Sequence, residues 1–295
     1  MSVYEQRRSC RPVNRLLATC SFVVAMAAHA QPSPAQDATA HPALNSYGQP
    51  PFAALPAGRT TGLARTFVDQ LNKESGPRQR FELQTLPRRR LEVALDDARF
   101  AGVALFLAPE FLQNASHRDG HWSVPVMIDE NLLVSVRPLT VDALDALSGK
   151  RFGGIAGHVY RVLSPLIDAG RIERSDAADH LANLGKLCLG RVDFVVISRS
   201  EFAGNAPLVP CSTSFKPMPF PEPQVIVRRV LVRMPGGQDS QRVLDAVGRV
   251  ACGEQWLSAL AAYGLTTAGC ARKAALNVSN ASSSATPTPL PARRR

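Results

Sequence analysis

Short apolar runs separated by amphipathic stretches are the feature that most constrains how this chain folds. GVALFL at 102–107 and DFVVI at 193–197 are typical of strands that are buried on both faces of a sheet. Leu63, Phe67 and Leu71 recur every four residues, which is the spacing of an amphipathic helix. The alternation of these patterns predicts an α/β protein with mostly parallel sheets.

The same periodicities predict the remaining elements. Further strands are expected at 81–86, 131–137, 151–156 and 225–234. Helices are expected around Leu91 and Leu95, from 158 to about 169, and from about 239 to 263. Four prolines at every second position from 217 to 223 predict a stiff connector before the strand at 225.

The first thirty residues have the pattern of a secretory signal peptide. Four arginines precede the 13-residue apolar stretch 16–28, and the small-x-small sequence 28–30 (AHA) follows. The apolar stretch is too short for a membrane helix. We therefore expect residues 1–30 to direct Sec-dependent export to the periplasm.

Composition shifts bound the folded part of the chain. Residues 31–43 (QPSPAQDATAHPA) predict a disordered spacer, and residues 271–295 predict a disordered tail without periodicity. The folded body is therefore expected at about 44–270.

The charge pattern argues against a nucleic-acid partner. The formal net charge is +10, and 29 of the 34 basic residues are arginines scattered along the chain. Only 88–90 and 293–295 form clusters, and neither cluster is interleaved with aromatic residues. A nucleic-acid-binding protein more often shows a basic stripe or a known module.

Four cysteines remain after the signal peptide, and in an oxidising compartment an even number predicts two disulfides. Three pairings are possible, and short loops favour Cys188–Cys211 with Cys252–Cys270. A zinc site is the alternative, but none of the spacings has the C-x-x-C form.

No sequence signature of an enzyme is present. GxSxG, SxxK, HExxH, P-loop and GxGxxG patterns are all missing. The best metal candidate is the loop with His117, Asp119 and His121, where spacing identifies no further ligand. We therefore predict no catalytic residues, no metal and no cofactor.

A series of short motifs resembles family 3 of the extracytoplasmic solute-binding proteins, which have the type II periplasmic binding protein fold. The motifs follow the family's order from residue 47 to residue 264: YGQPPF at 47–52, GRTTGL at 58–63, LPRRR at 86–90, WSVP at 122–125, LLV at 132–134, LSGKRFG at 147–153, GRVD at 190–193 and YG at 263–264. Each motif is weak alone, and their order makes the set specific.

The resemblance implies a two-lobed Venus-flytrap protein. Lobe 1 would comprise 44–136 and 227–270, and lobe 2 would comprise 137–226. A small polar or anionic metabolite would bind in the interlobe cleft of a monomer, which would deliver it to an inner-membrane permease of an ABC transporter. The alternatives are a ligand-sensing periplasmic partner of a signalling protein and, on fold analogy, a dehydratase-type enzyme.

Eight residues are candidates for ligand binding. The turn 153–157 would expose backbone N–H groups at a helix N-terminus, although its glycines also suit a plain turn. Arg90 suits a bidentate pair with a carboxylate or a solvated helix face, and Phe52 suits a cleft wall or the core. The set is Tyr47, Phe52, Arg90, Ser123, Gly157, His158, Tyr160 and Ser198.

Two departures from the family pattern bear on the ligand. The segment that carries a carboxylate-binding arginine in amino-acid binders is APEF at 108–111, without an arginine. The position of the aspartate that binds the α-amino group is Ser198. The sequence therefore argues against a standard α-amino acid as ligand.

Overall fold

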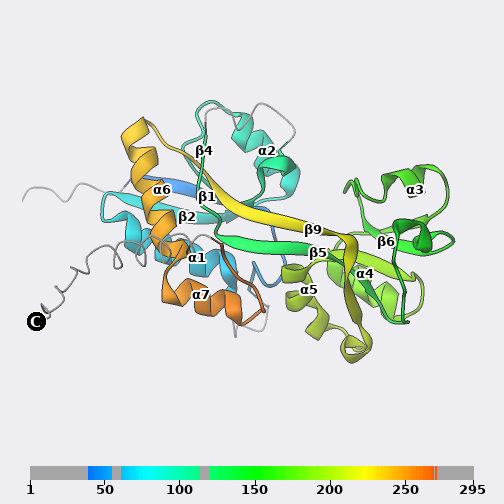
Figure 1. The fold of residues 1–295 in the computed structure, drawn as a ribbon. Coiled ribbons are helices and arrows are strands. Elements are labelled where there is room, and N and C mark those ends of the chain that lie inside the picture. The colour runs from blue at the N-terminus through cyan, green and yellow to red at the C-terminus, as the bar shows by residue number, and fades with distance from the viewer. Residues whose placement is uncertain (1–38, 55–60, 113–119, 269, 271–295) are drawn as a thin grey trace, which may run out of the picture. The chain divides into compact units, whose positions relative to one another are not determined.

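The computed structural model describes residues 39–54, 61–112, 120–268 and 270. The strands of this part form one sheet in the order β2-β1-β3-β9-β5-β8-β6-β7, and β4 pairs with β9 (Figure 1). The strands are β1 (Thr39–Asn45), β2 (Gln79–Thr85), β3 (Gly102–Leu107), β4 (His121–Trp122), β5 (Met127–Ser135), β6 (Arg151–Ile155), β7 (Glu173–Ala177), β8 (Phe194–Ser198) and β9 (Lys216–Arg233).

Helices flank this sheet. They are α1 (Gly62–Ser75), α2 (Arg88–Asp96), α3 (Ser164–Asp168), α4 (His180–Cys188), α5 (Arg199–Asn205), α6 (Gly237–Ala251) and α7 (Glu254–Ala261). Within the described ranges, none of these helices has the length and apolar character needed to cross a membrane.

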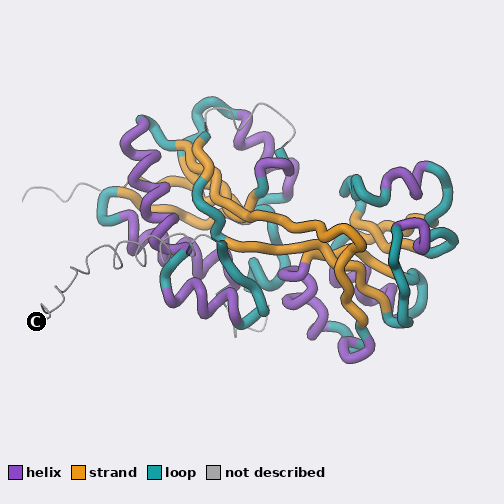
Figure 2. Tube along the Cα trace, in the orientation of Figure 1, coloured by secondary structure: helices purple, strands orange, loops and turns teal. Residues whose placement is uncertain are grey.

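The strands form two parallel groups joined by two antiparallel strands. The first group is β1, β2 and β3, and the second group is β6, β7 and β8. Strands β5 and β9 pair with each other; β9 also pairs with β3, and β5 also pairs with β8. Figure 2 shows these two long strands continuing from one group to the other. The predicted α/β class is confirmed, whereas the predicted lobe boundaries stay a prediction.

Both faces of each group are covered, which explains the uninterrupted apolar runs. Val103 and Leu105 of β3 pack into a core with α1, α6 and α7, whereas Ala104 and Leu107 pack against α2. Strand β8 alternates in the same way between two separate cores. The sequence pattern of a strand buried on both faces therefore predicted β3 and β8 correctly.

The expected spacer at 31–43 is wrong for its last five residues. Residues 39–43 belong to β1, which pairs with β2 on one side and with β3 on the other. Pro42 approaches β3 so closely that a Cβ at Gly102 would lie 2.3 Å from the Pro42 carbonyl oxygen. Small residues let β1 fit between two strands, so a composition typical of a linker forms an inner strand here. Residues 31–38, the signal segment 1–30 and the tail 271–295 lie outside the described residues.

The helix expected from 158 to 169 is also wrong. Only Ser164–Asp168 is helical, and Pro165 occupies its first turn. The preceding segment follows a turn at Gly157 (φ +76°), and the Tyr160 hydroxyl accepts the Ile155 N–H at 3.0 Å. No helix begins directly after Gly157, so the helix N-terminus that was expected at this turn is not there.

Two further boundaries differ from the prediction. The proline-rich segment 217–223 is the first half of β9, where only β5 pairs with it. Alternate residues of a strand point their N–H groups to the same side, so prolines at every second position are compatible with one paired edge. The expected helix 239–263 is two helices, interrupted at Cys252 and Gly253.

Both expected disulfides are present. Cys188–Cys211 ties the end of α4 to the segment before β9, and Cys252–Cys270 ties the α6–α7 junction to the end of the described chain. Each closes a short loop, with sequence separations of 23 and 18 residues.

Replacing Cys188 and Cys211 together by serine is expected to lower the free energy of unfolding by about 3 kcal/mol, because the unfolded chain gains loop entropy. Urea denaturation of the exported form, with the wild type as reference, measures the change. An unchanged midpoint would mean that this disulfide does not constrain the unfolded chain.

Candidate functional site

Polar residues follow the carboxyl ends of strands in both parallel groups. In the first group, Tyr47 follows β1 and Arg88 follows β2; in the second group, His158, His180 and Glu201 follow β6, β7 and β8. The carboxyl ends of parallel strands share one edge, which is where open α/β sheets place their ligands. Each group therefore gathers its polar residues at the edge that suits a ligand. The hollow between α1 and β2 contains none of these residues.

A buried ion pair lies where β5 and β9 cross between the groups. Arg228 of β9 is 1% exposed, and its Nε and Nη2 donate to Oδ2 of Asp129 on β5 at 2.9 and 2.8 Å. Asp129 also accepts the backbone N–H of Ser200 at 3.1 Å and its hydroxyl at 2.6 Å. A buried carboxylate needs this number of donors to offset its lost hydration. The pair therefore connects β5, β9 and the start of α5.

Arg228 also orders the first-group side of the site. Its Nη1 donates to the Tyr47 hydroxyl at 2.5 Å and to the Phe106 carbonyl at 3.3 Å. Phe106 has φ +58°, a costly left-handed conformation for an aromatic residue, near the end of β3. Burial raises the pKa of Tyr47, although the Arg228 charge acts to lower it. The Tyr47 phenol therefore keeps its proton, and this O–H donates to no described residue.

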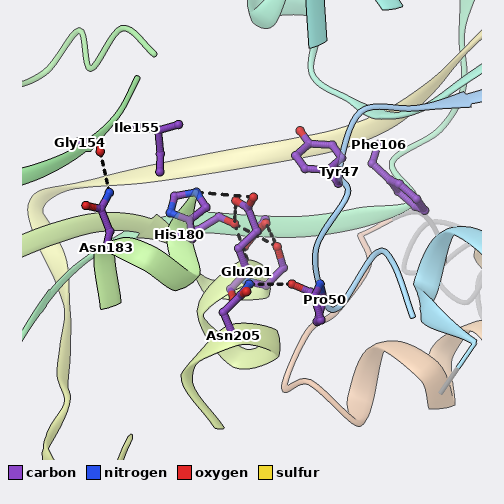
Figure 3. A network of polar contacts seen from close by, with 12 residues as sticks. Tyr47, Pro50, Phe106, Gly154, Ile155, His180, Asn183, Glu201 and Asn205 are labelled. Atoms are coloured by element: carbon purple, nitrogen blue, oxygen red, sulfur yellow. Dashed lines mark hydrogen bonds and ion pairs between the residues drawn. The ribbon is translucent and has the colours of Figure 1, made fainter. Parts of the chain in front are cut away.

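On the second-group side, Glu201 is held by the turn that opens α5. Ser198 caps α5: its hydroxyl donates to Glu201 Oε2 at 2.6 Å and accepts the Glu201 N–H at 3.3 Å. The other carboxylate oxygen, Oε1, lies 3.6 Å from His180 Nε2, at the start of α4 (Figure 3). The side chains of Glu201 and His180 are 19% and 18% exposed. This carboxylate is therefore positioned by its own helix cap and accessible to solvent.

Helix α5 contacts the loop after β1 directly. Asn205 Nδ2 donates to the Pro50 carbonyl at 2.9 Å, a bond that Figure 3 shows beside Glu201. A Cβ at Gly204 would lie 2.3 Å from the Pro50 carbonyl carbon, so a side chain there would collide with backbone. The two polar edges therefore meet at this contact.

Charges act across the two edges. The Glu201 carboxylate interacts electrostatically with Tyr47 and Arg228 from the first side and with His158 and Tyr160 from the second. Arg88, from the first group, likewise acts on His158. These residues, 181 positions apart at the extremes, therefore form one electrostatic site with Glu201 among them.

Arg174 on β7 shapes the loop that carries His158. Its Nη2 donates to the carbonyls of Ile155 and His158 at 3.0 and 2.9 Å, and its Nε donates to Asp176 at 2.6 Å. The guanidinium also lies 5.4 Å from the centre of the Tyr160 ring. Burial raises the pKa of Tyr160 to about 12, so this phenol is neutral.

The sequence-predicted residues divide into two sets. Ser198 hydrogen bonds to Glu201, and Tyr47, His158 and Tyr160 interact with it electrostatically. Phe52 stacks on Tyr47 with ring centroids 4.4 Å apart, but it is 1% exposed and belongs to the core. Their roles toward a ligand stay predictions.

The three remaining candidates, Arg90, Ser123 and Gly157, have other surroundings. The Arg90 side chain is exposed, and Arg88, not Arg90, interacts with Tyr47 and His158. Ser123 is 3% exposed, and its hydroxyl donates to Val124 and accepts the Val230 N–H. Gly157 is an exposed turn residue without a helix behind it.

Sequence reasoning missed Arg228, Asp129, Glu201 and His180. Two signals were available. Arg228 falls in phase with the buried Ile226 and Val230 of an alternating strand, where a charged residue needs a partner. Ser198 and Glu201 form an S-x-x-E capping pattern at the end of an apolar strand.

Metal binding finds no support among the described residues, where no three His, Cys, Asp or Glu side chains gather closely enough to hold an ion. His117 and Asp119 of the earlier candidate lie outside the described residues.

The fold matches solved structures of periplasmic binding proteins. An ancestral arginine-binding protein bound to arginine matches 76% of this chain and 98% of its own, at 16% identity and a TM-score of 0.59. A structure from work on glutathione import through a cystine ABC importer of Streptococcus mutans matches 77% of this chain and 95% of its own, at 11% identity and a TM-score of 0.61. A histidine kinase sensor domain similar to periplasmic binding proteins matches 78% of this chain and 99% of its own, at 13% identity and a TM-score of 0.60.

No family model matches the chain, and no curated protein sequence matches it. The structural matches, at this level of identity, define the fold. The chain has the periplasmic binding protein fold, of the kind that amino-acid-binding proteins use, as the motif series predicted.

Replacing Asp129 by asparagine is expected to destabilise the protein by about 3–5 kcal/mol, because Arg228 stays charged and buried without a counter-charge. Glu130→Gln is the matched control: it removes the neighbouring carboxylate, which pairs with Arg199 at the surface, and is expected to cost less than about 1 kcal/mol. Urea denaturation measures both variants. Equal losses would show that the buried pair is no more important than the exposed one.

The titration of His158 is expected to report the charges around it. Desolvation of its ring lowers its pKa, and the His180 charge lowers it further, whereas Glu201 acts to raise it. His180→Gln should therefore raise the His158 pKa, and Glu201→Gln should lower it, as measured by NMR of the imidazole. The folded pKa lies below the unfolded value of about 6.5. At a pH between these two values the unfolded chain binds more protons than the folded one, so the stability of the fold decreases as the pH drops through this range. Shifts of the opposite sign would contradict this placement of the three groups.

Proposed function

We propose that this protein is a periplasmic solute-binding protein that binds a small polar or anionic metabolite between its two strand groups and delivers it to a membrane transporter. The observation that carries the proposal is the convergence of polar residues at the carboxyl ends of strands in both groups. Tyr47 and Arg88 from one side and His158, His180 and Glu201 from the other interact around one site. A solute bound there would contact both groups at once.

The connection between the groups suits a hinge. Strands β5 and β9 are the two long strands that join the groups, and the predicted lobe boundaries at 136–137 and 226–227 fall at the end of β5 and within β9. A ligand that contacts both sides would favour the closed arrangement, because it gains its full set of contacts only there. A closed form distinct from the open one would then be recognised by a membrane permease.

The contacts at the site favour a polar ligand over an anionic one. Arg88 donates to Glu92 and to the Phe111 carbonyl, Arg174 pairs with Asp176, and Arg228 pairs with Asp129. An arginine that already has a carboxylate partner offers a second carboxylate less binding energy than a free arginine would.

The proposal includes no catalysis and no cofactor. The polar groups of the site are arranged as hydrogen-bond and charge partners, and the Ser198 hydroxyl is bonded to a carboxylate and to Ser200 instead of a histidine base. Turnover of a small acid by the purified protein would contradict this part of the proposal.

A ligand-sensing role beside a signalling protein is the second candidate. The structural match to a histidine kinase sensor domain supports it, since that domain shares the fold. Both roles use ligand-dependent closure, so the partner decides between them. Ligand-dependent co-purification with a permease would support transport, and co-purification with a sensor kinase would support signalling.

Export to the periplasm through the Sec pathway is part of the proposal. The sequence of residues 1–30 supports it, and so do the two disulfides, which form and persist in oxidising compartments.

A thermal-shift screen of residues 31–295 against amino acids, organic acids, amines and metal ions tests the proposal. A solute at 100 times its Kd is expected to stabilise the protein by about 2.7 kcal/mol, which raises the Tm by several degrees. The denatured protein with the same solutes is the control for indirect dye effects. Failure of every small solute to shift the Tm or to show heat in calorimetry would contradict a solute-binding role.

A further inference from the structure

The charged groups of the site are unequally paired. Arg228, Arg174 and Arg88 each have a carboxylate partner, at 2.8, 2.6 and 2.8 Å from Asp129, Asp176 and Glu92. Glu201 is different: among the described residues, its charged neighbour within ion-pair distance is His180, at 3.6 Å, and no arginine or lysine pairs with it. The site therefore contains a carboxylate without a permanent cationic partner.

Glu201 is placed where a ligand would meet it. Its first oxygen is fixed by the Ser198 hydroxyl, which leaves the second oxygen, Oε1, with the imidazole of His180 as its neighbour. Figure 3 shows the Glu201 and His180 side chains directed toward each other. The carboxylate is partly exposed and interacts electrostatically with groups from both edges of the site. It is therefore a partly exposed carboxylate that interacts with groups from both edges.

The charge balance at the site is negative. The three arginines contribute +3, and Asp129, Asp176, Glu92 and Glu201 contribute −4, so the sum over these groups is 3 − 4 = −1. A charged ligand binds well in a partly buried site when it neutralises the charge already there. A cation does so, whereas an anion increases the imbalance.

We propose that the ligand carries a protonated amine and no carboxylate, and that the Glu201 carboxylate binds its ammonium group. This inference rests on the proposed solute-binding function and names the ligand class. Ser198 holds the carboxylate in place, and the neutral O–H of Tyr47 supplies a hydrogen-bond donor for an acceptor elsewhere on the ligand. The ammonium group gains a charge-assisted hydrogen bond to a carboxylate that is only partly exposed to water.

The same contacts disfavour the two closest alternatives. An α-amino acid would bring a carboxylate to a site where Arg88, Arg174 and Arg228 already have carboxylate partners, and a second carboxylate would have to compete with them. A divalent metal ion prefers three or more protein ligands, and such a group is missing among the described residues.

Matched pairs that differ only in the α-carboxylate test this inference on residues 31–295. The probes are agmatine and arginine, 1,4-diaminobutane and ornithine, and histamine and histidine, with succinate as an anion and Zn²⁺ and Ni²⁺ as metal ions. We expect the amine of at least one pair to bind at least about tenfold more tightly than its amino acid in isothermal titration calorimetry. This comparison uses the wild-type protein, so it does not depend on whether a variant folds.

Glu201→Gln is the second part of the test. It is expected to weaken binding of that amine by at least about tenfold, because the ammonium loses its charged acceptor. Glu130→Gln, which removes a partly exposed carboxylate paired with Arg199, is the matched control and should leave the affinity unchanged. The melting curve of each variant verifies its fold.

The outcomes separate this inference from the proposed function. Tighter binding of the amino acids, of succinate or of the metal ions alone would overturn the ammonium ligand, and binding of the organic probes would still support solute binding. An unchanged amine affinity in Glu201→Gln would overturn the role of this residue. If no probe binds and the broader thermal-shift screen also finds no solute, the proposed function fails and this inference fails with it.

Discussion

The Arg228–Asp129 ion pair is the interaction on which the arrangement of the site depends. Both side chains are almost fully removed from water, and each needs the other to stay charged there. The pair joins the two strands that connect the parallel groups. Asp129 also binds Ser200 at the start of α5. Arg228 also binds Tyr47 and the carbonyl of Phe106, a residue with a strained backbone conformation. One buried contact thus aligns residues from both edges of the site.

This contact also determines which partners Arg228 has beside Tyr47 in the candidate site. The arginine near Tyr47 is not available as a ligand for a carboxylate, because it is used within the fold. The carboxylate that remains available, Glu201, comes from a helix cap and not from the strand position where the family has an aspartate.

Much of the fold could be predicted from periodicity, because β3, β8, α1 and α2 have strong apolar patterns with a single interpretation. Strand β1 could not, since Pro42 and small residues resemble a linker until two neighbouring strands are present to pair with them. The site was predictable only in part. The motifs suggested Tyr47, His158, Tyr160 and Ser198 as candidates. Arg228 and Glu201 stand out only through their contacts with Asp129, 99 residues away, and with His180, 21 residues away, and no local pattern specifies these contacts.

The close approach of Gly204 to Pro50 has a mechanical consequence. The backbones touch there without any side chain between them, and Asn205 adds a hydrogen bond to the same carbonyl. The distance between α5 and the loop after β1 is thus set by the thickness of the main chain. A movement that keeps this hydrogen bond would therefore leave the start of the chain's first loop and the end of α5 at one fixed separation.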